Sequence, residues 1–333
     1  MGRTTRFPRP LTAGDRVRVV APSRSLGILS PETCEIATAT LAGLGLQVDY
    51  GTHAREMDAF ASTSIAVRVA DLHDAFRDPN VAGILTAIGG YNANELLDHL
   101  DFELIARNPK TFCGYSDITI LTSAIFQETG LATFYGPHFS SFGMKLGNEH
   151  TVEHFRRACL SREPFHLEAA ARWSDDAWYL DQDERQFRPN PGPRVLRPGR
   201  ASGTLVGGHL GTLGLLQGTD WFPTVEDPVL FVEEDEGAAE EFPFEFLRDL
   251  HSLLQQPALR NLRALLIGRL HSSTKLIDGT EEHMLETLRL ASDVPVILGL
   301  DVGHTMPLST LPLGAQVDVD ATRAAPALRI RFE

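Results

Sequence analysis

The chain has 333 residues, of which 43% are hydrophobic and 22% charged, and its formal net charge at pH 7 is −14. This composition is typical of folded globular proteins, and the length predicts two domains. The acidic excess argues against a nucleic-acid or anionic-membrane surface, which would need clustered lysines and arginines. Three cysteines without CxxC spacing predict neither a disulfide framework nor a zinc site.

No apolar run reaches the roughly 18 residues that a membrane span requires, and the N-terminus has no apolar leader segment. We therefore expect a cytoplasmic protein.

The first part of the chain alternates strand and helix patterns, as expected for a parallel sheet covered by helices. Ser30 and Pro31 supply an N-cap and a first helical residue. The patterns predict strands over 17–21, 46–50 and 81–88 and helices over 31–44 and 65–77. We predict an α/β fold whose N-terminal domain, residues 1–165, is a doubly wound parallel sheet of flavodoxin or Rossmann type.

Residues 166–200 differ in composition from the segments on either side, because Trp173, Trp178 and Tyr179 stand among acids and a proline-rich stretch follows them. We interpret this segment as a linker that carries an aromatic substrate loop. Strand and helix patterns then resume, with strands over 229–232, 264–267 and 296–300 and a helix around 244–254. Residues 201–333 are therefore predicted to form a C-terminal mixed α/β domain.

A short apolar strand ending at Gly114 leads into Ser116 and then into a helical pattern. A turn of this kind exposes a serine oxygen at the carboxyl edge of a sheet, where N–H groups opening the helix can stabilise an oxyanion. The sequence is not GxSxG, since glycine occurs only two residues before the serine and Asp117 follows it. From these residues alone, a catalytic serine and a helix-capping serine are equally good interpretations.

Paired glycines, Gly89 and Gly90, follow the predicted strand 81–88. At this edge of a sheet they let the backbone approach a ligand or supply a second oxyanion donor, although a plain tight turn is an alternative. The GxGxxG pattern of a dinucleotide-binding oxidoreductase is absent.

A serine nucleophile needs a base, and the base needs a group that orients it. His304 stands out among 12 histidines because it lies in a turn after the strand 296–300, with a glycine before it. Glu233 directly follows the apolar strand 229–232, where burial suits a carboxylate that orients an imidazole. The acidic run continues to Glu236, and spacing alone does not choose among its four acids.

Together these segments resemble the LD-carboxypeptidase family of serine peptidases, and within it the MccF-like branch associated with microcin C self-immunity. The resemblance covers most of the chain, and the order and spacing of the motifs are specific. The motifs are Ala21-Pro22-Ser23, Gly89-Gly90-Tyr91-Asn92, Gly114-Tyr115-Ser116-Asp117-Ile118-Thr119, Tyr135-Gly136-Pro137, Gly207-Gly208, Leu230-Phe231-Val232-Glu233-Glu234, Gly303-His304-Thr305 and Leu311-Pro312-Leu313-Gly314.

By this resemblance, Ser116 is the nucleophile, His304 is the general base and later the acid, and Glu233 orients His304. The resemblance also implies that the backbone N–H groups of Gly90 and Asp117 form the oxyanion hole. It implies no metal and no cofactor.

Substrate contacts are expected at Tyr91, Trp178 and His209. Trp178 is our preferred residue for stacking on an adenine, with anchoring of the loop as the alternative. His209 stands where family members usually carry asparagine, which indicates either a changed preference for a polar group of the substrate or a structural histidine.

The resemblance implies cleavage of an amide bond through an acyl-enzyme, with a small peptide or peptide-nucleotide as substrate. We favour peptidyl- or aminoacyl-nucleotide compounds of the microcin C type, whose cleavage serves detoxification or self-immunity. The alternative is a muropeptide LD-carboxypeptidase of cell-wall recycling, and the alternative from another class is a non-catalytic ligand-binding protein on this fold. A homodimer is expected from the family.

Overall fold

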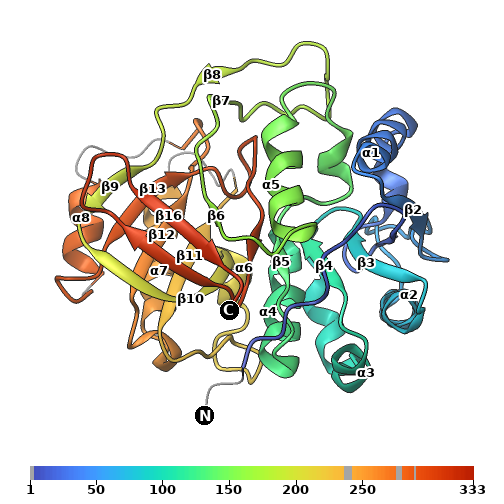
Figure 1. The fold of residues 1–333 in the computed structure, drawn as a ribbon, viewed down its shortest axis with the longest axis horizontal. Helices are drawn as coiled ribbons and strands as arrows, with labels where there is room; N and C mark the ends of the chain where they lie inside the picture. Colours follow the sequence, from blue (N-terminus) through green and yellow to red (C-terminus); the bar gives the residue numbers. More distant parts are fainter. Residues whose placement is uncertain (1–3, 236–241, 275–279, 289) are drawn as a thin grey trace.

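The computed structural model describes residues 4–235, 242–274, 280–288 and 290–333. Two β-sheets with their helices lie side by side, one built mainly from the first half of the chain and the other from the second (Figure 1). The α/β architecture predicted from the sequence is confirmed.

The first sheet contains five parallel strands in the order β5-β4-β3-β1-β2, and β14 joins its edge antiparallel to β5. This is the flavodoxin-type order, in which β2 and β3 pair with opposite sides of β1. The strands are β1 (Arg16–Val20), β2 (Gln47–Tyr50), β3 (Val81–Thr86), β4 (Thr111–Gly114), β5 (Phe134–Tyr135) and β14 (Leu311–Pro312).

The helices that connect these strands begin and end where local sequence signals predict. Ser30 caps the first of them, since its hydroxyl accepts a hydrogen bond of 3.0 Å from the backbone N–H of Thr33. Gly130 ends another in the left-handed region, with φ 68°. The helices are α1 (Pro31–Gly43), α2 (Ile65–Arg77), α3 (Phe102–Arg107), α4 (Thr119–Thr129) and α5 (Glu149–Cys159).

The second sheet is mixed, with the order β6-β16-β15-β10-β11-β12-β13-β9. Strands β10 to β13 are parallel, and antiparallel strands extend the sheet on both sides. The strands are β6 (Phe165–His166), β9 (Arg194–Arg197), β10 (Arg200–His209), β11 (Pro228–Glu233), β12 (Ala264–Gly268), β13 (Val296–Leu300), β15 (Gln316–Asp320) and β16 (Ala327–Arg331).

Helices α6 (Leu210–Gly214), α7 (Phe242–Leu254) and α8 (Thr280–Thr287) accompany this sheet. The predicted linker 166–200 contains the small hairpin of β7 (Arg172–Trp173) and β8 (Arg188–Pro189) and also supplies the edge strand β9. The domain boundaries themselves stay a prediction. Within the described ranges, no helix combines the length and the apolar character that crossing a membrane needs.

The two halves of the chain share their hydrophobic core. One buried cluster joins Leu121 of α4 to Leu213 of α6, and a second contains Tyr135 and Phe231, whose ring centroids lie 5.1 Å apart. Burying a side chain of this size contributes about 1.5–3 kcal/mol. Because these contacts cross from one sheet to the other, they fix the relative position of the strand ends that carry the site.

Candidate active site

The carboxyl ends of the parallel strands from both sheets meet at one cavity of about 390 Å³. The loops after β3 and β4 bring Gly90 and Ser116 to it, and the segments at the ends of β10 and β13 bring His209 and His304. Ligands of open α/β sheets bind at this edge, and the volume suits a small molecule.

Ser116 occupies the sharp turn between β4 and α4 that the sequence predicts. Its φ is +59°, a left-handed conformation that residues other than glycine rarely adopt and that is concentrated at functional sites. The backbone N–H of Ser116 donates a hydrogen bond of 3.2 Å to the hydroxyl of Tyr135. Gly114 is required here, because a Cβ at this position would lie 2.2 Å from Thr86 Oγ1.

Ser116, His304 and Glu233 form a continuous chain of hydrogen bonds. Ser116 Oγ lies 3.0 Å from His304 Nε2, and His304 Nδ1 lies 2.8 Å from Glu233 Oε2. Glu233 is the last residue of β11 and is fully buried. Gly303 permits this approach, since a Cβ there would lie 2.0 Å from Glu233 Oε2. Glu233 is therefore the acid of the run that meets His304, and Glu236 lies outside the described residues.

Tyr135 completes the surroundings of Glu233, because its hydroxyl donates a hydrogen bond to Oε1. Burial alone would raise the pKa of Glu233, but the attraction and hydrogen bond of His304 and the bond from Tyr135 lower that pKa to about 2. Burial and the charge of Glu233 raise the pKa of Tyr135 well above its usual range. Glu233 is thus ionised and Tyr135 protonated at neutral pH.

The carboxylate of Asp117 anchors the loop after β3 that carries Gly89 and Gly90, which we call the glycine loop. Its buried Oδ2 accepts hydrogen bonds of 2.6 Å from Ser23 Oγ, 3.0 Å from Asn92 N and 2.9 Å from Ala93 N. Three of the sequence motifs therefore converge on one carboxylate. Gly90 is confined by this packing, since a Cβ there would lie 2.2 Å from Ser23 Oγ.

The backbone N–H groups of Gly90 and Asp117 donate to no other group in the part of the chain that the structure describes. Gly89 lies against the nucleophile, because a Cβ added to it would be 3.2 Å from Ser116 Oγ. The loop after β3 and the start of the helical segment after β4 therefore present two free donors beside Ser116.

His138 is buried next to the site and takes no part in the hydrogen-bond chain. Its Nδ1 lies 2.7 Å from Thr86 Oγ1, and its ring stacks on Tyr115 with centroids 4.3 Å apart. Burial, together with the nearby His304 and Arg24, lowers the pKa of His138 well below its usual range. We therefore interpret His138 as a neutral packing residue.

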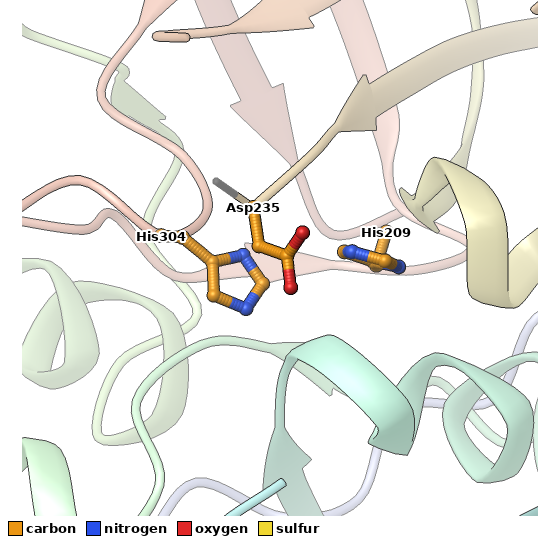
Figure 2. Close-up of side chains that lie close together, drawn as sticks. All are labelled: His209, Asp235 and His304. Carbon is orange, nitrogen blue, oxygen red and sulfur yellow. The ribbon is translucent and has the colours of Figure 1, made fainter. Parts of the chain in front are cut away.

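His209 lies at the start of α6 with its ring centroid 5.3 Å from that of His304. His209 Nδ1 accepts a hydrogen bond of 3.1 Å from Thr212 N, so the imidazole caps the helix, and its Nε2 lies 2.5 Å from Glu234 Oε1. His209, Asp235 and His304 face one another closely enough, within 4.8 Å, to hold a metal ion (Figure 2). Both nitrogens of each imidazole already have protein neighbours, so a cation would compete with existing contacts.

The aromatic residues of the 166–200 segment separate into two groups. Trp178 lines the cavity and packs against Met144 and Met306, and the exposed Tyr179 lies beside it. A third aromatic residue, Tyr91, lies outside this segment, in the loop after β3, where it is 83% exposed and also lines the cavity. Trp173 does not line the cavity, and its ring lies under the guanidinium groups of Arg188 and Arg269, at 5.2 and 4.9 Å.

Two residues at the site had no role assigned from the sequence. Tyr135 lies in the Tyr-Gly-Pro motif, but a tyrosine at a strand end carries no sign that it will reach a carboxylate on the other sheet. Arg24 follows the Ala-Pro-Ser motif and lines the cavity. The position of Arg24 in the loop after β1 was the available signal, since loops at this edge of a sheet bind ligands.

Comparison with known proteins identifies two family domains. Residues 17–136 match the LD-carboxypeptidase N-terminal domain, and residues 202–319 match the LD-carboxypeptidase C-terminal domain. The chain is 46% identical to YocD of Bacillus subtilis (strain 168) over 315 residues, covering 95% of this chain and 96% of YocD. It is 27% identical to the microcin C7 self-immunity protein MccF of Escherichia coli, over 93% of this chain and 92% of MccF.

A murein tetrapeptide carboxypeptidase of Pseudomonas aeruginosa is 26% identical, over 92% of this chain and 94% of that enzyme. Among solved structures, an MccF-like protein from Bacillus anthracis superposes with a TM-score of 0.96 at 42% identity, covering 99% of this chain and 100% of that one. MccF in complex with aspartyl sulfamoyl adenosine superposes with a TM-score of 0.85 at 25% identity, covering 97% and 98%. By its sequence and by both of its domains, the chain belongs to the LD-carboxypeptidase family of serine peptidases.

Proposed function

We propose that this chain is a serine hydrolase that cleaves an amide bond in peptidyl- or aminoacyl-nucleotide compounds, with Ser116, His304 and Glu233 as its catalytic triad. The observation that carries the proposal is the hydrogen-bond chain of 3.0 Å and 2.8 Å from the serine through the imidazole to a buried carboxylate. Hydrolases with a serine nucleophile use this arrangement to activate an otherwise weak nucleophile.

In the proposed mechanism, His304 Nε2 takes the proton of Ser116 as Oγ attacks the scissile carbonyl carbon. Glu233 keeps Nδ1 protonated, so that Nε2 carries the lone pair, and stabilises the imidazolium that forms. The N–H groups of Gly90 and Asp117 stabilise the oxyanion of the tetrahedral intermediate. His304 then protonates the leaving nitrogen, and water resolves the acyl-enzyme by the same steps.

The nucleotide-type substrate is supported by two observations. Two of the MccF structures that resemble this chain hold aspartyl sulfamoyl adenosine and glutamyl sulfamoyl guanosine. In this chain Trp178 lines the cavity, where its ring can stack on a base. The second candidate is a murein tetrapeptide carboxypeptidase, because a relative with that name covers the chain nearly as well as MccF does.

Mass spectrometry of the products distinguishes the two substrate classes. The purified protein is incubated separately with aspartyl sulfamoyl adenosine and with a murein tetrapeptide. Cleavage of the adenosine compound alone supports the proposed substrate, and release of D-alanine alone assigns the second candidate. Failure to cleave either compound would contradict both and favour a non-catalytic ligand-binding protein.

Replacing Trp178 by alanine is expected to raise KM for the adenosine compound roughly 10- to 100-fold, since stacking of a base on an aromatic ring is worth about 1–3 kcal/mol. KM for the murein peptide is expected to change little. Steady-state kinetics on both compounds provide the measurement, and Trp178→Phe is the matched control that retains a stacking face. An equal loss on both compounds would show that Trp178 instead anchors the loop on Met144 and Met306.

A chelator is expected to leave kcat/KM unchanged, because the proposed mechanism uses no metal. Added Zn²⁺ is expected to inhibit, since histidine and carboxylate are ligands that it prefers and its binding to His304 displaces a triad contact. Initial rates across a Zn²⁺ titration measure the inhibition constant. Asp235→Asn should raise that constant, and an unchanged value would contradict binding at this cluster (Figure 2).

The homodimer and the cytoplasmic location that were expected from the sequence stay predictions.

A further inference from the structure

Arg24 occupies a distinctive place in the fold. It lies in the loop after β1, at the carboxyl edge of the first sheet. The neighbouring strands β1 and β3 are followed by β2 and β4, which lie on opposite sides of this pair, and doubly wound sheets bind ligands at such a point. Its Nε donates a hydrogen bond of 3.2 Å to the carbonyl oxygen of Gly89, and its guanidinium carbon lies 6.0 Å from the ring centre of Tyr91. The guanidinium group is thereby held in the wall of the cavity, beside the glycine loop.

Arg24 is also the sole lysine or arginine among the described residues that line this cavity. Within the described chain, no carboxylate lies within 4.0 Å of its guanidinium group, and the two terminal nitrogens make no hydrogen bond to protein. Two acids of the other wall are already paired, Asp175 with Arg188 at 3.4 Å and Asp176 with Arg185 at 2.7 Å, and Asp235 lies beside His209 and His304. The cavity therefore presents one guanidinium group whose two terminal nitrogens are free to bind a ligand.

We infer that Arg24 binds an anionic group of the substrate, next to the carbonyl that Ser116 attacks. A guanidinium fork matches a carboxylate, sulfamate or phosphate through paired N–H donors. Arg24 and Ser116 flank the same residue, because Arg24 Nε lies 3.2 Å from the carbonyl oxygen of Gly89 and a Cβ on Gly89 would lie 3.2 Å from Ser116 Oγ. An anion bound by Arg24 therefore lies within a few bonds of the carbonyl that Ser116 attacks. This inference rests on the proposed function, because it assigns a group of the substrate in the same cavity.

The shared chemistry is an anion close to the scissile amide, and two sources can supply it. In a murein tetrapeptide it is the terminal carboxylate of the leaving D-amino acid. In an aminoacyl sulfamoyl nucleoside it is the acyl sulfamate. Arg24 can also brace the glycine loop through Gly89, and a role of that kind would affect charged and neutral ligands alike.

The test measures binding in the Ser116→Ala background, so that its result does not depend on turnover. Calorimetry compares each anionic ligand with a neutral counterpart: the murein tetrapeptide with its C-terminal carboxamide, and aspartyl sulfamoyl adenosine with an aspartyl adenosine amide that lacks the sulfamoyl group. Each pair is measured with Arg24 retained, with Arg24→Met and with Arg24→Lys. Arg55→Met is the matched control, since Arg55 is an exposed arginine that lies 5.3 Å over Tyr50 and does not line the cavity.

We expect Arg24→Met to weaken binding of the anionic ligand that the cavity accepts by roughly 10- to 100-fold and to leave its neutral counterpart within about twofold. Arg24→Lys should retain part of the preference, and Arg55→Met should retain all of it. The pair that shows the effect identifies the source of the anion. Equal weakening of both members would overturn the inference, because it would show that Arg24 only supports the glycine loop through Gly89. No binding of either anionic ligand would also overturn it. Absence of turnover in the wild type would contradict the proposed function alone.

Discussion

Replacing Ser116 by alanine is expected to reduce kcat by a factor on the order of 10⁴ to 10⁶, which is the loss seen when a triad nucleophile is removed. The reason is geometric: the deleted oxygen is the atom that lies 3.0 Å from His304 Nε2, and no other hydroxyl is hydrogen-bonded to that nitrogen in the described chain. The measurement is a single-turnover or steady-state assay on whichever substrate the wild type cleaves.

Binding and folding serve as controls for this variant. The substrate's Kd should stay within a fewfold, because the hydroxyl contributes to chemistry more than to contact. The melting temperature should not fall, since alanine also fits the space beside Gly89, where a hypothetical Cβ lies 3.1 Å from Ser116 Cβ. Hydrolysis at an appreciable fraction of the wild-type rate would contradict the triad assignment.

The parts of this fold that could be predicted from the sequence are those with local causes. Periodic apolar residues and the Ser30-Pro31 cap predict α1 correctly, and the apolar runs predict β1 to β4 of the first sheet and β11 to β13 of the second. The edge strands β9 and β14 were not predicted. Each is short, and each exists because another strand, β13 or β5, offers an open edge that is distant in sequence. Such pairing depends on tertiary structure and leaves little local pattern.

The same distinction applies to the site. Glu233 and His304 were chosen because each ends a strand or follows one, and the structure brings them to 2.8 Å of one another. Spacing alone could not separate Glu233 from the other acids of its run, because the choice depends on burial under Tyr135. Asp117 was considered for its backbone N–H, and its carboxylate proves to join the glycine loop to Ser23. Contacts between segments 94 residues apart cannot be seen in a local motif.

Replacing Glu233 by glutamine is expected to lower kcat by a factor on the order of 10³ to 10⁴, as for the equivalent change in other triads. An amide can donate its N–H to His304 Nδ1, which moves the imidazole proton to Nε2, and Nε2 then no longer accepts the proton of Ser116. The neutral side chain also fails to stabilise the imidazolium. Glu234→Gln is the matched control, because it makes the same change one residue away and should stay within about tenfold.

Stability against pH gives an independent readout of the same side chain. The folded-state pKa of Glu233 is lowered from 4.5 to about 2, so its ionised form stabilises the fold above pH 4.5, and this stabilisation is lost as the pH falls toward 2. Glu233→Gln lacks that contribution. The difference in free energy of unfolding between wild type and variant should therefore be largest near neutral pH and should shrink as the pH falls from 4.5 to 2. A difference that stays constant over this range, with kcat unchanged at neutral pH, would show that Glu233 does not act as a buried carboxylate paired with His304.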